Sequence, residues 1–253
     1  MMIEAFALSD IGRRRRVNAD AALIDPDAGV VAVADGMGDL PRSADVARRA
    51  LDAMRDVFST PCDVFPAPWA QLAPAERWPT LAAELLMRGV MQANRSLYAP
   101  GLRQPLGTTL AAAVACCEHI CFAHVGDSRI YLLRASSGRL VRLTEDDTVL
   151  TRGLVHGMLP HEAARQPDVH ALTRAVGMDL EIPVRPCTLR WGAGDMVMVC
   201  TDGLTDSMSA ERIERLMRAC ENNLCAAARR LVSEANAADG RDNVTVVLAR
   251  RTG

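Results

Sequence analysis

Four aspartates in this sequence stand where a run of apolar residues meets a short loop that contains glycine or another small polar residue. They are Asp35, Asp127, Asp202 and Asp242, beside the apolar runs 30–34, 121–125, 196–200 and 244–247. Apolar runs of this length are typical of buried strands, and glycine lets the backbone turn sharply or approach a ligand closely. Each aspartate is therefore predicted to lie at the end of a rigid strand, beside a loop that leaves one side open.

Such a group of carboxylates predicts a site for divalent cations. Carboxylates held close together repel one another, and each is costly to bury alone, but a cation relieves both problems. Oxygen ligands without a histidine or cysteine cluster favour Mg²⁺ or Mn²⁺ over zinc. Two such ions about 4 Å apart can activate a water and stabilise an in-line displacement at phosphorus. A lone Asp-Gly is most often a simple turn, so the prediction of a phosphate ester hydrolase rests on four such positions in one chain.

A run of four arginines, 13–16, precedes Asn18 and Asp20 and offers a cation for a phosphate group. Such a basic run is usually a solvated loop, but the site needs only one guanidinium that turns inward and holds two phosphate oxygens. All 29 basic residues are arginine. No lysine can therefore act as nucleophile or Schiff base, and any cationic side chain that binds phosphate must be an arginine.

The elements that must position these residues come in blocks. Short apolar or alternating runs predict strands at 2–8, 21–24, 30–34, 108–115, 120–125, 130–133, 182–189, 196–200 and 244–249. Helical spacing of apolar residues predicts helices at 42–58, 81–97, 210–219 and 224–237. Blocks of strands separated by helix pairs differ from the alternation of a doubly wound sheet. The pattern indicates antiparallel sheets stacked on each other, with helix pairs on the outer faces.

Composition limits the class of protein. A chain of 253 residues that is 49% apolar can form one large domain, and the proline-rich segment 59–79 is predicted to be a loop within it. The net charge of −2 provides no basic field for nucleic acid. The eight cysteines form no C-x-x-C pair, which argues against a zinc site or a disulfide framework. The sequence has no run of 18 apolar residues and no signal-peptide pattern, so we expect no membrane contact and a cytoplasmic location.

Seven motifs, in the same order along nearly the whole chain, resemble those of the metal-dependent type 2C (PPM) protein serine/threonine phosphatases in their compact bacterial form. They are Arg15-x-x-Asn18-x-Asp20, Asp35-Gly36-Met37-Gly38, Gly107-Thr108-Thr109, Gly126-Asp127-Ser128-Arg129, Leu172-Thr173-Arg174-Ala175-Val176-Gly177, Thr201-Asp202-Gly203 and Gly240-Arg241-Asp242-Asn243. Any one motif is weak, but seven in order are specific. The resemblance implies an α+β fold, a four-layer α-β-β-α sandwich of two mostly antiparallel sheets flanked by helix pairs, formed by 1–253 as a single domain.

The resemblance also implies roles for the acidic residues. Asp35 would bridge two Mn²⁺ or Mg²⁺ ions, and the Gly36 carbonyl would bind one of them. Asp202 and Asp242 would complete the protein ligands of the other ion. Asp20 would act mainly through metal-bound water.

The remaining implied roles concern a third ion and the substrate. Asp127 would hold, with Asp202, a third and weaker ion, and Arg15 would bind the phosphate of the substrate. Residues 144–170 match the flap, a segment beside the site that varies in the family and influences substrate choice. The implied reaction is hydrolysis of phosphoserine or phosphothreonine by a metal-bridging hydroxide, which makes Arg15 and Asp35 the catalytic residues.

Three positions depart from the pattern of the family. Ala19 stands where an acidic residue usually precedes Asp20, so one water-mediated contact to a metal is missing. Asp39 replaces a usual glycine and adds negative charge near the site. Asp147 stands where the flap commonly carries a histidine. None of these departures removes a direct metal ligand, and the prediction of an active enzyme stands.

Several alternatives stay open at this point. The leaving alkoxide would take its proton from a metal-bound water or from His124, His156, His161 or His170, histidines that are more often structural or solvent-facing. A catalytically inactive module that binds phosphorylated partners is a second class of function, and a phosphatase of an anti-sigma antagonist is a third. The preferred prediction is a monomer that acts on phosphorylated proteins and reverses a separate bacterial Ser/Thr kinase.

Overall fold

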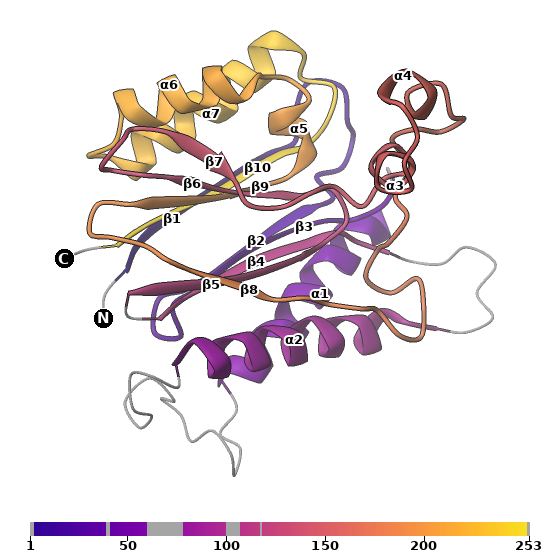
Figure 1. The fold of residues 1–253 in the computed structure, drawn as a ribbon, viewed down its shortest axis with the longest axis horizontal. Helices are drawn as coiled ribbons and strands as arrows, with labels where there is room; N and C mark the ends of the chain where they lie inside the picture. The colour runs from indigo at the N-terminus through magenta and orange to yellow at the C-terminus, as the bar shows by residue number, and fades with distance from the viewer. Residues whose placement is uncertain (1–2, 39–40, 60–77, 100–106, 117, 252–253) are drawn as a thin grey trace.

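The computed structural model describes residues 3–38, 41–59, 78–99, 107–116 and 118–251. These residues form two five-stranded sheets that lie one above the other (Figure 1). The first sheet runs β1 (Ile3–Asp10), β10 (Val244–Arg251), β9 (Met196–Cys200), β6 (Arg129–Leu133) and β7 (Leu140–Arg142). The second runs β2 (Asp20–Asp25), β3 (Val30–Asp35), β4 (Leu110–Cys116), β5 (His119–Val125) and β8 (Cys187–Arg190). All these neighbouring strands pair antiparallel.

Two pairs of helices cover the outer faces of the sheets (Figure 1). The second sheet carries α1 (Pro41–Ser59) and α2 (Trp78–Leu97), and the first carries α6 (Ala210–Ala219) and α7 (Leu224–Ala238). The predicted four-layer α-β-β-α sandwich is therefore confirmed. Within the described ranges, no helix combines the length and the apolar character that crossing a bilayer requires.

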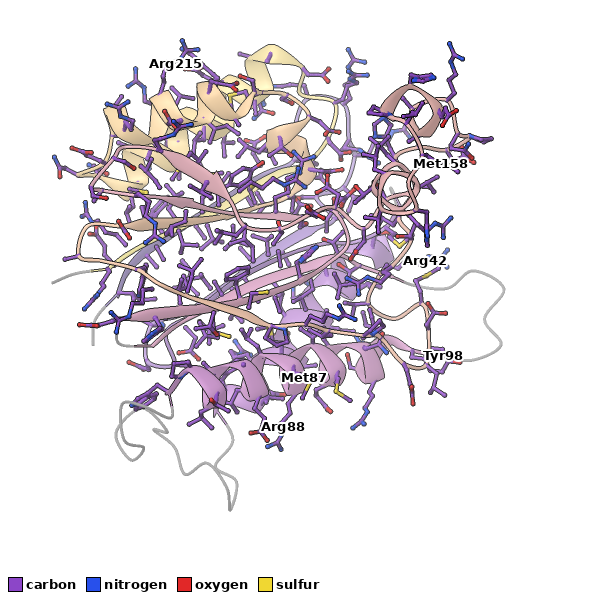
Figure 2. All side chains as sticks on the ribbon, in the orientation of Figure 1. Arg42, Met87, Arg88, Tyr98, Met158 and Arg215 are labelled. Atoms are coloured by element: carbon purple, nitrogen blue, oxygen red, sulfur yellow. The ribbon has the colours of Figure 1, made fainter. Side chains whose placement is uncertain are left out.

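The strand β3 shows how the apolar pattern builds these layers. Val31 and Val33 point between the two sheets, where they join Val199 of β9 in one core. Ala32 points the other way, into a separate core under α1 and α2. Successive side chains of a strand face opposite sides, so a strand that is buried on both faces needs an uninterrupted apolar run. On the outside, Arg88 of α2 and Arg215 of α6 project away from the two helix layers (Figure 2).

One local prediction is wrong at its boundary, and one strand was missed. The predicted strand at 182–189 begins only at Cys187, because Pro183 and Pro186 have no backbone N–H to donate to a ladder. The short edge strand β7 was not predicted, because three residues are too few to show an alternation. Most of the predicted loop 59–79 lies outside the described residues.

The flap, residues 144–170, contains two short helices, α3 (Val149–Val155) and α4 (Pro160–Ala163). They stand beside one end of the sandwich, on the right of Figure 1, and not on either helix layer. A further short helix, α5 (Asp202–Thr205), begins where β9 ends. These three helices and the loops between strands therefore surround the same end of the two sheets.

Asn94 of α2 ties the segment that follows the flap to the second helix layer. Its side chain is 2% exposed. Its Nδ2 donates to the carbonyls of Asp179 and Leu180, at 2.9 and 3.3 Å, and its Oδ1 accepts from the Gly177 N–H at 2.7 Å.

Asn94→Ala is expected to lower the free energy of unfolding by about 2 kcal/mol, because it leaves the buried Gly177 N–H without its acceptor and removes the donor to two further carbonyls. Urea unfolding measures the change. Asn222→Ala, at an exposed position, is the matched control and should stay within about 0.5 kcal/mol of the parent. Equal stability of the two variants would show that Asn94 does not anchor the segment.

Candidate metal centre

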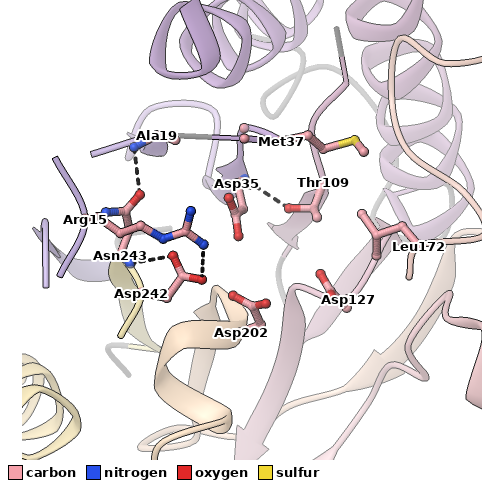
Figure 3. Close-up of a pocket in the computed structure, with 12 residues that line it drawn as sticks. Arg15, Ala19, Asp35, Met37, Thr109, Asp127, Leu172, Asp202, Asp242 and Asn243 are labelled. Atoms are coloured by element: carbon pink, nitrogen blue, oxygen red, sulfur yellow. Dashed lines mark hydrogen bonds and ion pairs between the residues drawn. The ribbon is translucent and has the colours of Figure 1, made fainter. Parts of the chain in front are cut away.

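The aspartates that follow or precede strands meet at one end of the sandwich (Figure 3). Asp35 is the last residue of β3 in the second sheet, whereas Asp202 follows β9 and Asp242 precedes β10 in the first. Asp127 lies in the turn between β5 and β6, which connects the two sheets. These four residues line a cavity of about 230 Å³, here called the acidic pocket. Aspartates from both sheets therefore share one site.

Asp20 does not line the acidic pocket. It is paired with Asp35 across the β2–β3 ladder, and it is 9% exposed. Its Oδ2 accepts hydrogen bonds from the hydroxyls of Thr201 and Thr245, at 2.9 and 2.7 Å. Sequence reasoning missed these two threonines as a pair. The available signal was Thr245 itself, a polar residue within the apolar run of β10, which needs a buried partner.

Burial works against the negative charge of these carboxylates. Removal from water raises the pKa of Asp35 and that of Asp202 well above the usual value, and neighbouring carboxylates raise both further. Burial raises the pKa of Asp20 to about 6, although its two threonine partners lower it. The pKa of Asp127 is also about 6, raised first by burial and then by the charge of Asp146. A cation in the pocket would stabilise the ionised forms of these residues.

Among the buried side-chain atoms of the described residues, two carboxylate oxygens have no hydrogen-bond partner: Oδ1 of Asp20 and Oδ1 of Asp202. Buried polar atoms without a partner are rare in folded proteins and indicate a missing ligand. Among the described residues, no three His, Cys, Asp or Glu side chains form a ready-made chelate. The donors are nonetheless oxygens, negatively charged and incompletely satisfied, which fits a hard divalent cation such as Mn²⁺ or Mg²⁺.

Two glycines let the loops of the site approach each other. A Cβ on Gly36 would lie 2.1 Å from the carbonyl oxygen of Ser43, and a Cβ on Gly203 would lie 2.0 Å from that of Asn243. Both distances exclude a side chain, so any other residue would push the backbone apart. Gly36 lines the acidic pocket, and the role of its carbonyl in metal binding stays a prediction.

Polar side chains hold the loops that carry the aspartates. Thr109 Oγ1 accepts a hydrogen bond from the Asp35 N–H at 3.0 Å and lies 2.7 Å from the Ser128 hydroxyl. Asn243 Oδ1 accepts from the Ala19 N–H at 2.8 Å. Its Nδ2 donates to the carbonyls of Ile11 and Val17, in the loop between β1 and β2. These residues belong to the sequence motifs, but their positioning roles become visible only in the structure.

Arg15 is the one arginine of the run 13–16 that is not exposed. It lines the acidic pocket, and its Nη2 donates to Asp242 Oδ2 at 2.6 Å (Figure 3). The side chain remains 35% exposed, so it lies at the boundary between the aspartates and solvent. The guanidinium of Arg15 turns inward, as predicted for one arginine of the run. It lies where it can bind an anion beside the aspartates.

The three departures from the family pattern have different outcomes. Ala19 is buried and lines the acidic pocket, and its side chain has no oxygen to offer there. Asp39 lies outside the described residues. Asp147 Oδ2 accepts the Gly126 N–H at 2.9 Å and pairs with Arg174 at 2.8 Å. The aspartate therefore links the start of the flap to the turn that carries Asp127.

Comparison with known proteins decides the family. The family model of Protein phosphatase 2C matches residues 13–236. The chain belongs to the protein phosphatase 2C family. "Serine/threonine phosphatase stp" of Listeria welshimeri is 30% identical over 252 residues, which cover 96% of this chain and 94% of that protein. The crystal structure of the PPM Ser-Thr phosphatase MsPP from Mycobacterium smegmatis, in complex with cacodylate, is 29% identical with a TM-score of 0.80 and covers 100% of this chain and 99% of its own.

A further structure, the catalytic domain of the serine threonine protein phosphatase PstP in complex with two manganese ions, has a TM-score of 0.77 at 28% identity and covers 100% of this chain and 99% of its own. Membership of the protein phosphatase 2C family confirms four predictions: the family, the fold, a metal-dependent phosphatase, and Mn²⁺ or Mg²⁺ as the cofactor. The substrates of such an enzyme are phosphorylated proteins.

Proposed function

We propose that this protein phosphatase 2C hydrolyses phosphoserine and phosphothreonine in proteins, with two Mn²⁺ or Mg²⁺ ions and a third, weaker one. The observation that carries the proposal is the acidic pocket, where aspartates from both sheets meet one inward arginine and an unsatisfied carboxylate oxygen. The name of the Listeria relative supports the substrate class, and the PstP structure with two manganese ions supports the number of tightly held ions.

Asp35 suits the role of a bridging ligand because of its place among the carboxylates. Burial raises its pKa first, and the charges of Asp20, Asp202, Asp242 and Asp127 raise it further, so all four carboxylates lie near it. An ion beside Asp35 would therefore be within reach of ligands from either sheet.

The other residues would take the outer positions of the centre. Asp202 and Asp242 would serve one ion, and the Gly36 carbonyl the other. Asp20, which does not line the pocket, would act through water. Asp127 would hold a third ion together with Asp202, whose pKa it raises.

The reaction forms a bond from a water oxygen to phosphorus and breaks the bond to the serine or threonine oxygen, which takes a proton. Bound ions would supply a water of lowered pKa and neutralise the charge on the phosphate oxygens. Arg15 would hold two of those oxygens and so orient the phosphorus. No described histidine lines the acidic pocket, and His124 Nε2 bonds the Glu145 carbonyl at 2.6 Å. We therefore assign the proton of the leaving group to water.

Hydrolysis of p-nitrophenyl phosphate and of a phosphothreonine peptide, with Mn²⁺ and with EDTA, tests this function. Turnover is expected with Mn²⁺ and none with EDTA. Binding of the phosphopeptide without hydrolysis under any divalent metal would instead establish an inactive phosphoprotein-binding module.

Arg15→Ala is expected to lower kcat/KM for a phosphopeptide about 30-fold, mainly through KM, because hydrogen bonds to a charged group are lost. The affinity for Mn²⁺, measured by calorimetry, should not fall, since Asp242 loses a competing cation. Arg16→Ala, at an exposed neighbour, is the control and should behave like the parent. An unchanged KM in the Arg15 variant would remove this arginine from the substrate site.

We propose a separate bacterial Ser/Thr kinase as the opposing enzyme, because phosphoserine and phosphothreonine must be made by phosphoryl transfer before they are hydrolysed. The proposed setting is the cytoplasm, where ATP for such a kinase is available, with 1–253 acting as one phosphatase domain and as a monomer. Phosphoproteomics of a deletion strain would identify the substrates by the phosphosites that accumulate.

A further inference from the structure

A second cavity lies on the far side of the wall that closes the acidic pocket. It has a volume of about 410 Å³ and is lined by 122–124 of β5, by 143–148, by α3, and by 173, 174, 185 and 187. We call it the flap pocket. A neighbouring hollow of about 660 Å³ shares the lining residues 143–146, Thr151 and Val155, so the flap pocket opens into a longer groove along α3. Cavities of this size accommodate small ligands or several peptide side chains.

The wall between the two pockets is thin. Leu172 lines the acidic pocket and the next residue, Thr173, lines the flap pocket. Asp147, which lines the flap pocket, makes two hydrogen bonds with Gly126, which directly precedes Asp127. Its backbone N–H donates to the Gly126 carbonyl at 2.9 Å, and its Oδ2 accepts from the Gly126 N–H at 2.9 Å. Figure 3 shows Leu172 beyond Asp127, on the side away from Arg15. An extended chain spans about 3.4 Å per residue, so a substrate whose phosphoresidue enters the acidic pocket reaches the flap pocket within a few residues.

Two of the three acidic side chains of the flap pocket are already neutralised. Asp147 pairs with Arg174 at 2.8 Å. Asp146 receives two hydrogen bonds from Arg129, at 2.7 and 3.0 Å, and a third from Arg142. These carboxylates are therefore engaged in holding the base of the flap to the sheets.

Two arginines of the same pocket are not neutralised. Arg152 of α3 and Arg185, before β8, line the pocket and make no ion pair or side-chain hydrogen bond with any part of the chain that the structure describes. Glu145, an exposed residue, is the remaining acidic lining residue. With the paired residues set aside, the pocket has two positive charges against one negative charge. Guanidinium groups in this situation favour phosphate or carboxylate oxygens.

The apolar lining indicates that the anion arrives on a peptide. Val155 is 73% exposed although it lines the pocket, and Phe122 and Leu143 form further apolar surface there. An exposed apolar side chain inside a hollow gains stability when another chain covers it. Inorganic phosphate would satisfy the arginines alone, whereas a peptide with an anionic side chain would satisfy the arginines and cover Val155.

We propose that the flap pocket is a second anion-binding subsite, in which Arg152 and Arg185 bind a phosphate or carboxylate side chain of the substrate a few residues from the phosphoresidue that is hydrolysed. This rests on the proposed phosphatase function, and it names the substrate class of the site: acidic or multiply phosphorylated segments of proteins.

The test compares three phosphothreonine peptides of equal length, with neutral neighbours, with aspartates, and with a second phosphate. For the parent enzyme with Mn²⁺, the two anionic peptides should have a KM about tenfold below that of the neutral peptide. The variant Arg152→Gln/Arg185→Gln should lose this difference and keep its activity on p-nitrophenyl phosphate. The matched control is Arg165→Gln/Arg190→Gln, two exposed arginines outside the pocket, which should retain it.

The outcomes separate the subsite from the function itself. Equal KM values for the three peptides, or an advantage that survives in Arg152→Gln/Arg185→Gln, would overturn the subsite while hydrolysis of p-nitrophenyl phosphate upholds the phosphatase. If no substrate is hydrolysed, the function fails, and fluorescence polarisation still tests the subsite through tighter binding of the anionic peptides. Inhibition by inorganic phosphate that weakens in the same variant, with no peptide preference, would make free phosphate the ligand and overturn the substrate assignment.

Discussion

Asp35→Asn is expected to abolish Mn²⁺-dependent release of phosphate and, at the same time, to make the metal-free protein more stable. Activity should fall at least about 1000-fold, a loss of about 4 kcal/mol of transition-state stabilisation, because the proposed ligand common to both ions loses its charge. Stability should rise because burial and four neighbouring carboxylates oppose the charge of Asp35. An amide of the same shape removes that conflict and can donate to a neighbour, for a gain of about 2 kcal/mol.

The two effects are measured on the same protein, by phosphate release with Mn²⁺ and by urea unfolding with EDTA. Asp27→Asn, in the exposed turn between β2 and β3, is the matched control and should change neither quantity. Asp202→Ala should also abolish activity. Full activity of either Asp35→Asn or Asp202→Ala would contradict the assignment of these aspartates as metal ligands. Loss of activity with a large loss of stability would show instead that Asp35 supports the fold.

The opposite signs of these two effects distinguish a functional carboxylate from a structural one. Replacing a residue that stabilises the fold lowers the stability of the protein. Replacing a carboxylate that other carboxylates repel raises it. Asp20 Oδ1 and Asp202 Oδ1 are buried without a partner among the described residues, which is a further cost to stability at this end of the sandwich. The fold tolerates that cost because the sheets on either side of the site are continuous apolar layers.

The sequence predicts the parts of this site that depend on local patterns, but not the contacts between residues that are far apart in the chain. The uninterrupted apolar run of β3 predicts a strand that is buried on both faces. The position of Asp35 is predicted too, because it ends that run. The pairing of Asp20 with Asp35 depends on the register of the β2–β3 ladder, which a short loop sets and periodicity does not show. The contact of Arg15 with Asp242 joins residues 227 positions apart. No local pattern predicts such a contact, and only the order of the motifs pointed to Arg15 among four arginines.

The flap shows the same limit of prediction from sequence. Its helices are short, and its polar residues read as loop, so the sequence predicts only a mixed segment. The ion pairs of Asp146 and Asp147, which fix its base, involve partners from β6, β7 and the segment after the flap. Once these pairs are known, the two unpaired arginines of the flap pocket can be recognised. That step requires the structure, because composition counts all arginines alike.

The metal-free protein is expected to become less stable as the pH rises from about 4 to about 7. The pKa of Asp20 and that of Asp127 are about 6 in the folded protein, against 3.8 for the ordinary carboxyl. The folded state therefore binds more protons than the unfolded state in this window, and stability falls as these protons leave. A shift of roughly two units corresponds to about 3 kcal/mol per residue, and the interaction between neighbouring sites makes the total less than a simple sum.

Saturating Mn²⁺ should reverse this pH dependence of stability, because the ion binds the ionised carboxylates and binds only the folded state. The stabilisation grows with the ratio of free metal to its dissociation constant, and reaches about 4 kcal/mol at a ratio of about 1000. Affinity falls at low pH, where protons compete for the ligands. Urea unfolding at pH 5.5 and 7.5 should thus show greater stability at pH 5.5 with EDTA and at pH 7.5 with Mn²⁺. Asp35→Asn should weaken both dependences, whereas Asp27→Asn should keep them. An identical pH dependence with and without Mn²⁺ would mean that the buried aspartates do not hold the metal.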